Sequence, residues 1–154
     1  MTDDAVKFLL VDDNDDNLAA LAGLLRRDGL ALITARSGTE ALERLLAHDV
    51  ALAIVDVQMP GMDGFELAQL MRGTERTRHI PIVFLTAAAG DEQRRFHGYE
   101  VGAVDYLTKP VEPHVLRSKA NLFFEHARQR EELTRQRDEL AASRARLLAH
   151  ADNS

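Results

Sequence analysis

Hydrophobic and polar positions along the chain fall into blocks that predict a repeating order of strand and helix. Apolar runs typical of short strands occur at 6–11, 31–35, 50–55, 80–86 and 104–108. The stretches between them predict helices over about 14–29, 37–49, 64–72 and 91–101, and a last helix begins near Pro113. Five alternations of this kind indicate an α/β fold, with a parallel sheet covered by helices on both faces.

Local signals support the first two helices. Asn14 is a good N-cap, Asp15 and Asp16 would lie in the first turn, and Gly29 is the expected stop. In the second helix a serine and a glutamate stand at the spacing of a capping box, Ser37 and Glu40.

The residues at the strand ends carry the candidate chemistry. In parallel α/β sheets, ligands bind beyond the carboxyl ends of the strands, where the strand order reverses. The residues expected at those ends are Asp12, Asp13, Asp56, Thr86, Thr108 and Lys109. Three carboxylates, a hydroxyl and an ammonium should therefore meet at one edge of the sheet.

Clustered carboxylates are tolerable when a hard cation such as Mg²⁺ lies among them. Without a cation they repel, so at least one of Asp12, Asp13 and Asp56 should titrate above an ordinary aspartate. An ammonium opposite the cation suits a phosphoryl group. Because the sequence has no GxxxxGK[ST] motif for a nucleotide, another molecule must donate that group. Asp56 can act as the nucleophile and form an acyl phosphate.

This constellation resembles the receiver domain of two-component response regulators. The motifs that carry the resemblance are FLLVDDN, AIVDVQMPGMDGFEL, PIVFLTA and GAVDYLTKP, in this order, and it covers about residues 5–126. It implies a doubly wound, flavodoxin-like five-stranded parallel sheet with strand order 2-1-3-4-5. It also implies a phosphoacceptor that receives its phosphoryl group from a histidine kinase or a histidine phosphotransfer protein, and no enzyme activity beyond self-catalysed phosphotransfer and autodephosphorylation.

The resemblance also assigns roles to single residues. Asp56 would be the phosphoacceptor. Asp13, Asp56 and the backbone carbonyl of Gln58 would bind Mg²⁺ directly, and Asp12 would hold it through water. The phosphoryl oxygens would be bound by Thr86 and Lys109, and a cis peptide before Pro110 would aim Lys109 inward. Tyr106 would be the switch aromatic that moves inward with Thr86, although ordinary core packing also explains a tyrosine there.

Two of the acids near the first strand have a simpler explanation. Asp15 and Asp16 would lie at the N-terminus of the helix, where negative charge interacts favourably with the helix dipole, and should face solvent. Only Asp12 and Asp13 of this stretch should then belong to the site.

Composition restricts the class of protein. The formal net charge of -6 argues against nucleic acid as a direct partner, and the absence of cysteine excludes disulfides and thiolate metal sites. No apolar run approaches the ~20 residues that span a bilayer, and Met1 is followed by Thr-Asp-Asp rather than a basic leader. We therefore expect a soluble cytoplasmic protein that does not contact the membrane.

The end of the chain differs from the rest, because it contains neither Gly nor Pro after Pro113. A helix from about His114 to His150 would run well past the receiver, so residues 127–154 are expected to form a helical extension. Leucines recur every seven residues there, each three residues after an arginine: Leu133, Leu140, Leu147 and Arg130, Arg137, Arg144. With both in the seam, a parallel homodimeric coiled coil could pass a signal to a downstream or partner domain. A solvated helix or a frayed linker is the alternative.

Two other functions are compatible with the fold. A degenerate receiver would serve only as a dimerisation or interaction scaffold. A Mg²⁺-dependent aspartyl-phosphate hydrolase of another α/β family would need an acid two residues after its nucleophile. Gln58 stands there after Asp56, which argues against that hydrolase.

Overall fold

The computed structural model describes residues 5–87 and 105–152. Its sheet has five parallel strands in the order β2-β1-β3-β4-β5, which confirms the predicted fold class. The strands are β1 (Val6–Val11), β2 (Leu30–Ala35), β3 (Leu52–Asp56), β4 (Ile82–Thr86) and β5 (Asp105–Thr108). The helices of the described residues are α1 (Asp15–Leu25), α2 (Gly38–Ala47), α3 (Gly64–Arg72) and α5 (Pro113–Asp152).

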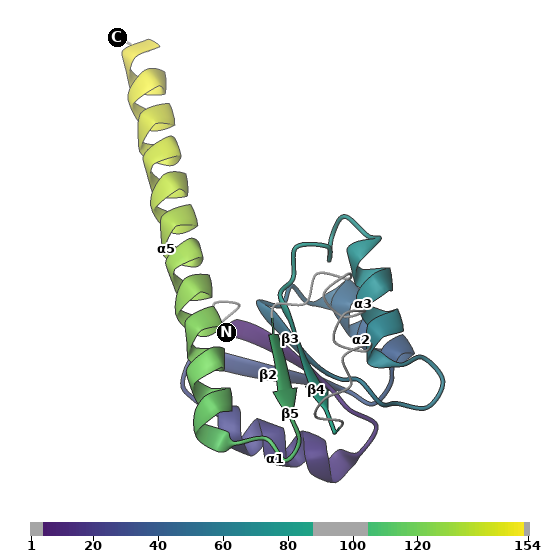
Figure 1. The fold of residues 1–154 in the computed structure, drawn as a ribbon. Helices are drawn as coiled ribbons and strands as arrows, with labels where there is room; N and C mark the ends of the chain where they lie inside the picture. Colours follow the sequence, from purple (N-terminus) through teal and green to yellow (C-terminus); the bar gives the residue numbers. More distant parts are fainter. Residues whose placement is uncertain (1–4, 88–104, 153–154) are drawn as a thin grey trace.

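The helices cover both faces of the sheet, α1 and α5 on one and α2 and α3 on the other (Figure 1). Successive residues of β1 point to opposite faces, so Phe8 and Leu10 belong to the core under α1 and α5, whereas Leu9 and Val11 belong to the core under α2 and α3. This double burial explains why the strand sequences are continuous apolar runs rather than alternating ones.

The predicted stop of the first helix at Gly29 was wrong. Helix α1 ends at Leu25, and Arg26 already has an extended ψ of 128°. Gly29 instead adopts φ +82° in the following turn, and its carbonyl accepts a hydrogen bond from the N–H of Val6 at 2.9 Å. The four residues from Arg26 to Gly29 are needed to reverse the chain and place β2 beside β1.

Helix starts agree with the predicted caps in part. The Asn14 side chain caps α1, and the Ser37 hydroxyl accepts a hydrogen bond from the N–H of Glu40. The Glu40 carboxylate lies 3.4 Å from Arg44. The reciprocal capping box occurs in α3 instead, between Asp63 and Glu66.

Other boundaries differ little, since β3 and β4 each begin two residues later than predicted. The helix expected between 91 and 101 lies outside the described residues.

Helix α5 has 40 residues, which corresponds to about 60 Å at 1.5 Å per residue. Its first part packs on the sheet through Leu116, Ala120, Phe124 and Ala127, all buried. The rest projects away from the sheet (Figure 1), and no side chain from 128 to 151 is buried. In the described part of the chain, no helix has the length and apolar character that crossing a membrane requires.

Candidate functional site

The first two candidate carboxylates meet because β1 and β3 are neighbours in the sheet. Val11 is paired with Val55, and the chain continues from these residues into Asp12 and Asp56. Beyond the end of β1, the N–H of Asp12 still donates to the carbonyl of Ala35 at 3.1 Å, so its backbone is fixed as an extension of the sheet.

The hydroxyl and the ammonium meet in the same way across β4 and β5. Thr86 is paired with Thr108, and Lys109 follows directly. The N–H of Lys109 donates to the carbonyl of Thr86 at 2.8 Å. Four strand ends thus bring the predicted residues to one edge of the sheet.

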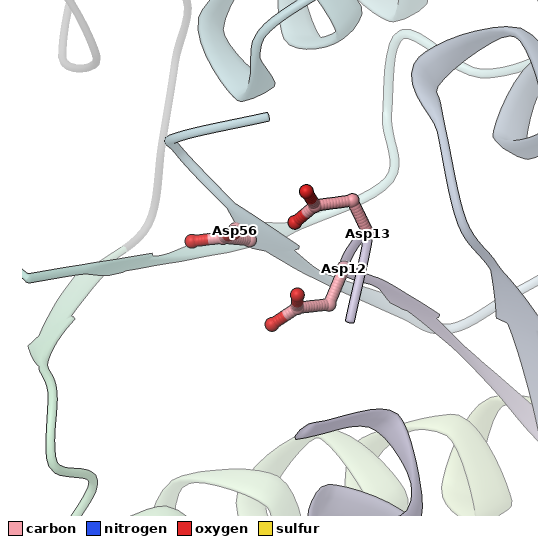
Figure 2. Close-up of side chains that lie close together, drawn as sticks. All are labelled: Asp12, Asp13 and Asp56. Carbon is pink, nitrogen blue, oxygen red and sulfur yellow. The ribbon is translucent and has the colours of Figure 1, made fainter. Parts of the chain in front are cut away.

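The three carboxylates form a compact cluster, drawn in Figure 2. One oxygen from each of Asp12, Asp13 and Asp56 lies within 4.8 Å of the other two. Asp12 and Asp56 are only 1% and 4% exposed, whereas Asp13 is exposed at the mouth of the cluster. The cluster therefore combines two buried acids with one that faces solvent.

Lys109 lies beside the buried pair. Its Nζ is 3.1 Å from Oδ1 of Asp56 and 3.4 Å from Oδ2 of Asp12. The peptide bond between Lys109 and Pro110 is cis, as the resemblance implied. One ammonium thus faces two buried carboxylates, so the described charges at this edge leave an excess of negative charge.

The pKa shifts reflect this balance. Burial raises the pKa of Asp56 above its ordinary value of 3.8, and the charge of Asp12 adds to the rise. The hydrogen bond and charge of Lys109 and the N–H of Gln58 oppose the rise without cancelling it. Burial lowers the pKa of Lys109, but Asp56 and Asp12 outweigh burial and raise it. The pKa of Asp56 is thus raised, as expected for one of the clustered acids, but burial contributes more to the rise than repulsion by Asp12 does.

Sequence reasoning missed the residue that orients Asp12. The Nδ2 of Asn17, in the first turn of α1, donates to Oδ2 of Asp12 at 3.3 Å, and the N–H of Asn14 donates to Oδ1 at 3.0 Å. Lys109 approaches the same Oδ2. The sequence did contain a signal for this contact, because Asn17 is a polar residue in the first helical turn after the strand-end acid Asp12.

The close approach of α3 to Asp56 was also missed. A Cβ on Gly64 would lie 2.5 Å from the carbonyl oxygen of Asp56 and 3.0 Å from Cα of Val57, so only glycine fits there. The N–H of Gly64 donates to the carbonyl of Val57 at 3.0 Å. This contact fixes the loop that contains Gln58, whose side chain is exposed.

Thr86 and Tyr106 lie where the sequence placed them. Thr86 is the last residue of β4 and is 4% exposed. The ring of Tyr106 is partly buried, with its centroid 5.5 Å from that of Phe84, and Phe84 in turn meets Phe65 edge-on at 4.8 Å. The tyrosine therefore packs at the margin of the core formed under α2 and α3.

Asp15 and Asp16 take no part in the cluster. Both are exposed in the first turn of α1, and Asp15 pairs with Arg36 at 2.7 Å. The structure thus confirms that only Asp12 and Asp13 of the acidic stretch belong to the edge.

The residues present fit a magnesium ion by their chemistry. Mg²⁺ takes oxygen ligands, often one or two carboxylates together with water. The cluster offers three such carboxylates, and Lys109 offsets their negative charge only in part. A cleft of about 490 Å³ between α1 and the segment after β5 adjoins it, with Asp12, Asn17 and Lys109 in its wall.

Fold and site together define a phosphoacceptor domain of two-component signalling, and comparison with known proteins agrees. The family model described as "Response regulator receiver domain" matches residues 8–121, and the chain belongs to this family. The "Probable cyclic di-GMP phosphodiesterase" of Vibrio cholerae is 36% identical over 130 residues, with 82% of this chain and 28% of that protein covered.

"Response regulator PleD" of Caulobacter vibrioides is 36% identical over 134 residues, with 82% and 29% covered. The chain thus spans less than a third of the length of these two relatives. Among solved structures, the chemotaxis protein CheY4 of Vibrio cholerae superposes with a TM-score of 0.71 at 31% identity, over 77% of this chain and 98% of that one.

Proposed function

We propose that Asp56 is the phosphoacceptor and that Mg²⁺ is held by Asp13, Asp56 and the Gln58 carbonyl, with Asp12 acting through a water molecule. The observation that carries the proposal is the cluster of three carboxylates within 4.8 Å, next to an ammonium 3.1 Å from Asp56. When bound, the cation would supply positive charge for the phosphoryl oxygens.

The transfer itself is a displacement at phosphorus. An oxygen of the Asp56 carboxylate attacks the phosphorus of a phosphohistidine on the donor, a kinase or a phosphotransfer protein. The new P–O bond forms as the P–N bond breaks, and the donor imidazole keeps the electron pair and takes up a proton. Because the acceptor must be ionised, its pKa, although raised, has to stay below the working pH. Lys109 opposes the rise in this pKa and so favours the ionised, reactive form of Asp56.

Lys109 and Thr86 would bind the transferred group. The ammonium already lies between Asp56 and Asp12, and the Thr86 hydroxyl is carried by the neighbouring strand end. Charge spread over the phosphoryl oxygens calls for donors on more than one side, which these two residues supply. The same residues would take part in hydrolysis of the acyl phosphate by water.

Tyr106 would report the phosphorylated state. Drawing Thr86 toward the phosphoryl group would open space beside β4 into which the ring moves. Its partly buried position against Phe84 supports this role, since a small displacement changes the surface at β5.

We further infer that residues 5–126 act as the receiver and residues 127–154 as a helical extension that carries the signal to a downstream or partner domain. Burial along α5 supports this division, because Ala127 is its last buried residue. The extension is proposed to pair with a second copy in parallel. The cytoplasmic location expected from the sequence stays a prediction.

Incubation with Mg²⁺ and a small acyl phosphate, followed by intact mass, tests the site. The wild type should gain about 80 Da, the mass of one phosphoryl group, and Asp56→Asn should not. Asp16→Asn, which changes an exposed acid outside the cluster, is the matched control and should behave as the wild type. An unmodified wild type would instead favour the scaffold alternative.

A further inference from the structure

Three exposed arginines recur every seven residues on the projecting part of α5: Arg130, Arg137 and Arg144. Within residues 5–87 and 105–152, none of them makes an ion pair or a side-chain hydrogen bond. Their neighbour Arg135 is different, since it lies 2.5 Å from Glu132 and 2.6 Å from Glu139. Single unpaired arginines are common on surfaces, so the argument depends on their spacing.

The glutamates held by Arg135 share that spacing. Glu132 stands five residues before Arg137, and Glu139 stands five residues before Arg144. In a parallel two-stranded coiled coil, a residue at position g of one helix approaches position e of the next heptad on its partner, which is five residues further on. The glutamates and the arginines occupy positions g and e when Leu133, Leu140 and Leu147 are at position a.

We propose that two copies of α5 form a parallel coiled coil in this register, with Glu132 and Glu139 of each chain paired with Arg137 and Arg144 of the partner copy. The proposal rests on the dimer put forward above and specifies the surface that forms it. Arg135 lies on the outer side of both glutamates and would hold them at the edge of the seam, where their remaining lone pairs can accept from the partner.

The register suggested by sequence alone puts the same leucines at position d. It would place Arg137 and Arg144 at position a, facing their own equivalents across the dimer axis, where like charges repel. Glu132 and Glu139 would then lie at position c, too far from the seam to compensate. The proposed register replaces these repulsions with attractions and leaves neutral residues such as Gln136 at position d.

Orientation follows from the same charges. An antiparallel pair brings position g against g and position e against e, so that glutamates would meet glutamates and arginines would meet arginines. Only the parallel arrangement joins opposite charges.

The receiver leaves this seam open. Leu122, at position d in the proposed register, is 72% exposed, whereas Ala120, Phe124 and Ala127 on the other side of α5 are buried against the domain. Leu133, Leu140 and Leu147 continue the exposed line, and each is at least 60% exposed. The two receivers would therefore lie on the outer sides of the helix pair.

Charge reversal in the full chain tests the register. Glu132→Arg with Glu139→Arg should weaken dimerisation about tenfold or more in sedimentation equilibrium at low salt. The matched control, Glu131→Arg with Asp138→Arg, makes the same change in charge one residue earlier, at the outward position f, and should dimerise as the wild type does. If the two double variants dimerise equally well, the proposed register is wrong. The alternative register, with the leucines at position d, predicts that result because it places all four substituted residues outside the seam.

Mixing two variants of opposite charge distinguishes two causes of weaker dimerisation: loss of pairing between chains, and loss of the contacts with Arg135 within one chain. The double variant Arg137→Glu, Arg144→Glu should also be a weak dimer by itself. When it is mixed with the Glu132→Arg, Glu139→Arg variant, the two should form a heterodimer because opposite charges then face each other. Absence of rescue, or a monomeric wild type, overturns the proposal. Phosphorylation of Asp56 is scored by mass and does not depend on this outcome.

Cross-linking gives a second measurement, since the chain has no native cysteine. Gln136→Cys at position d should form a disulfide-linked dimer on mild oxidation faster than Arg137→Cys at position e. Faster cross-linking of Arg137→Cys would show that the seam has the other register.

Discussion

The ammonium of Lys109 lies 3.1 Å from Oδ1 of Asp56 and joins the end of β5 to the end of β3. A change of charge at Asp56 therefore acts directly on the residue that follows β5. Tyr106 lies three residues earlier, within that strand. This contact gives the proposed site a physical connection to the proposed switch.

Lys109→Ala should break that connection. Asp56 should still become phosphorylated, although more slowly, because the acceptor loses one positive partner. The ring signals of Tyr106 in NMR should then no longer respond to phosphorylation. Lys119→Ala removes another lysine near β5, the partner of Asp105, and should keep the response. A normal tyrosine response in Lys109→Ala would refute the connection.

Mg²⁺ should stabilise the wild type and not Asp13→Ala. Binding to the folded state alone contributes about 2–3 kcal/mol when the free cation is about a hundredfold above its dissociation constant. Thermal melting with and without Mg²⁺ measures the effect. Asp16→Ala, which removes a nearby exposed acid outside the cluster, should retain the full rise in Tm. Wild-type melting that is indifferent to Mg²⁺ would exclude the proposed metal site.

Asp56→Asn should be more stable than the wild type at pH 7 in the presence of a chelator. Because burial raises the pKa of Asp56, the native state binds this proton more tightly than the unfolded chain does. Stability then falls as pH rises from the ordinary value of 3.8 through the raised value. The extra stability of Asp56→Asn over the wild type should be full at pH values above the raised pKa of Asp56. It should disappear below pH 3.8, where the Asp56 carboxyl is protonated in both the folded and the unfolded state. Paired melting curves across this range check the sign.

Substitutions along α5 should affect the stability of the fold in the receiver part of the helix and not in its extension. Phe124 is 3% exposed, and Cζ of Arg27 lies 3.7 Å from the centroid of its ring. Phe124→Ala should therefore lower the free energy of unfolding by about 3 kcal/mol or more. Leu133 is 60% exposed, and Leu133→Ala should change the stability of a dilute, monomeric sample by less than about 0.5 kcal/mol. Denaturant unfolding measures both. A large loss in Leu133→Ala would place the boundary further along the helix.

The sequence by itself determined the order of elements and the residues at the strand ends. Continuous apolar runs identified doubly buried strands, and parallel strands must end at the same edge of the sheet. The sequence alone therefore predicts that Asp12, Asp56, Thr86 and Lys109 lie at the same edge. Asn14 was identifiable as a cap because that role depends only on neighbours along the chain.

Tertiary structure decided what depends on contacts between distant segments. The end of α1 at Leu25 follows from the turn that brings β2 beside β1, not from the position of Gly29. The hydrogen bond from Asn17 to Asp12 and the fit of Gly64 against Asp56 require the helices to be seated on the sheet. The unpaired state of Arg137 also became visible only in space, because a helix could have paired it with acids on its own face. Local signals fix caps and strands, whereas these features depend on where the packed elements bring side chains together.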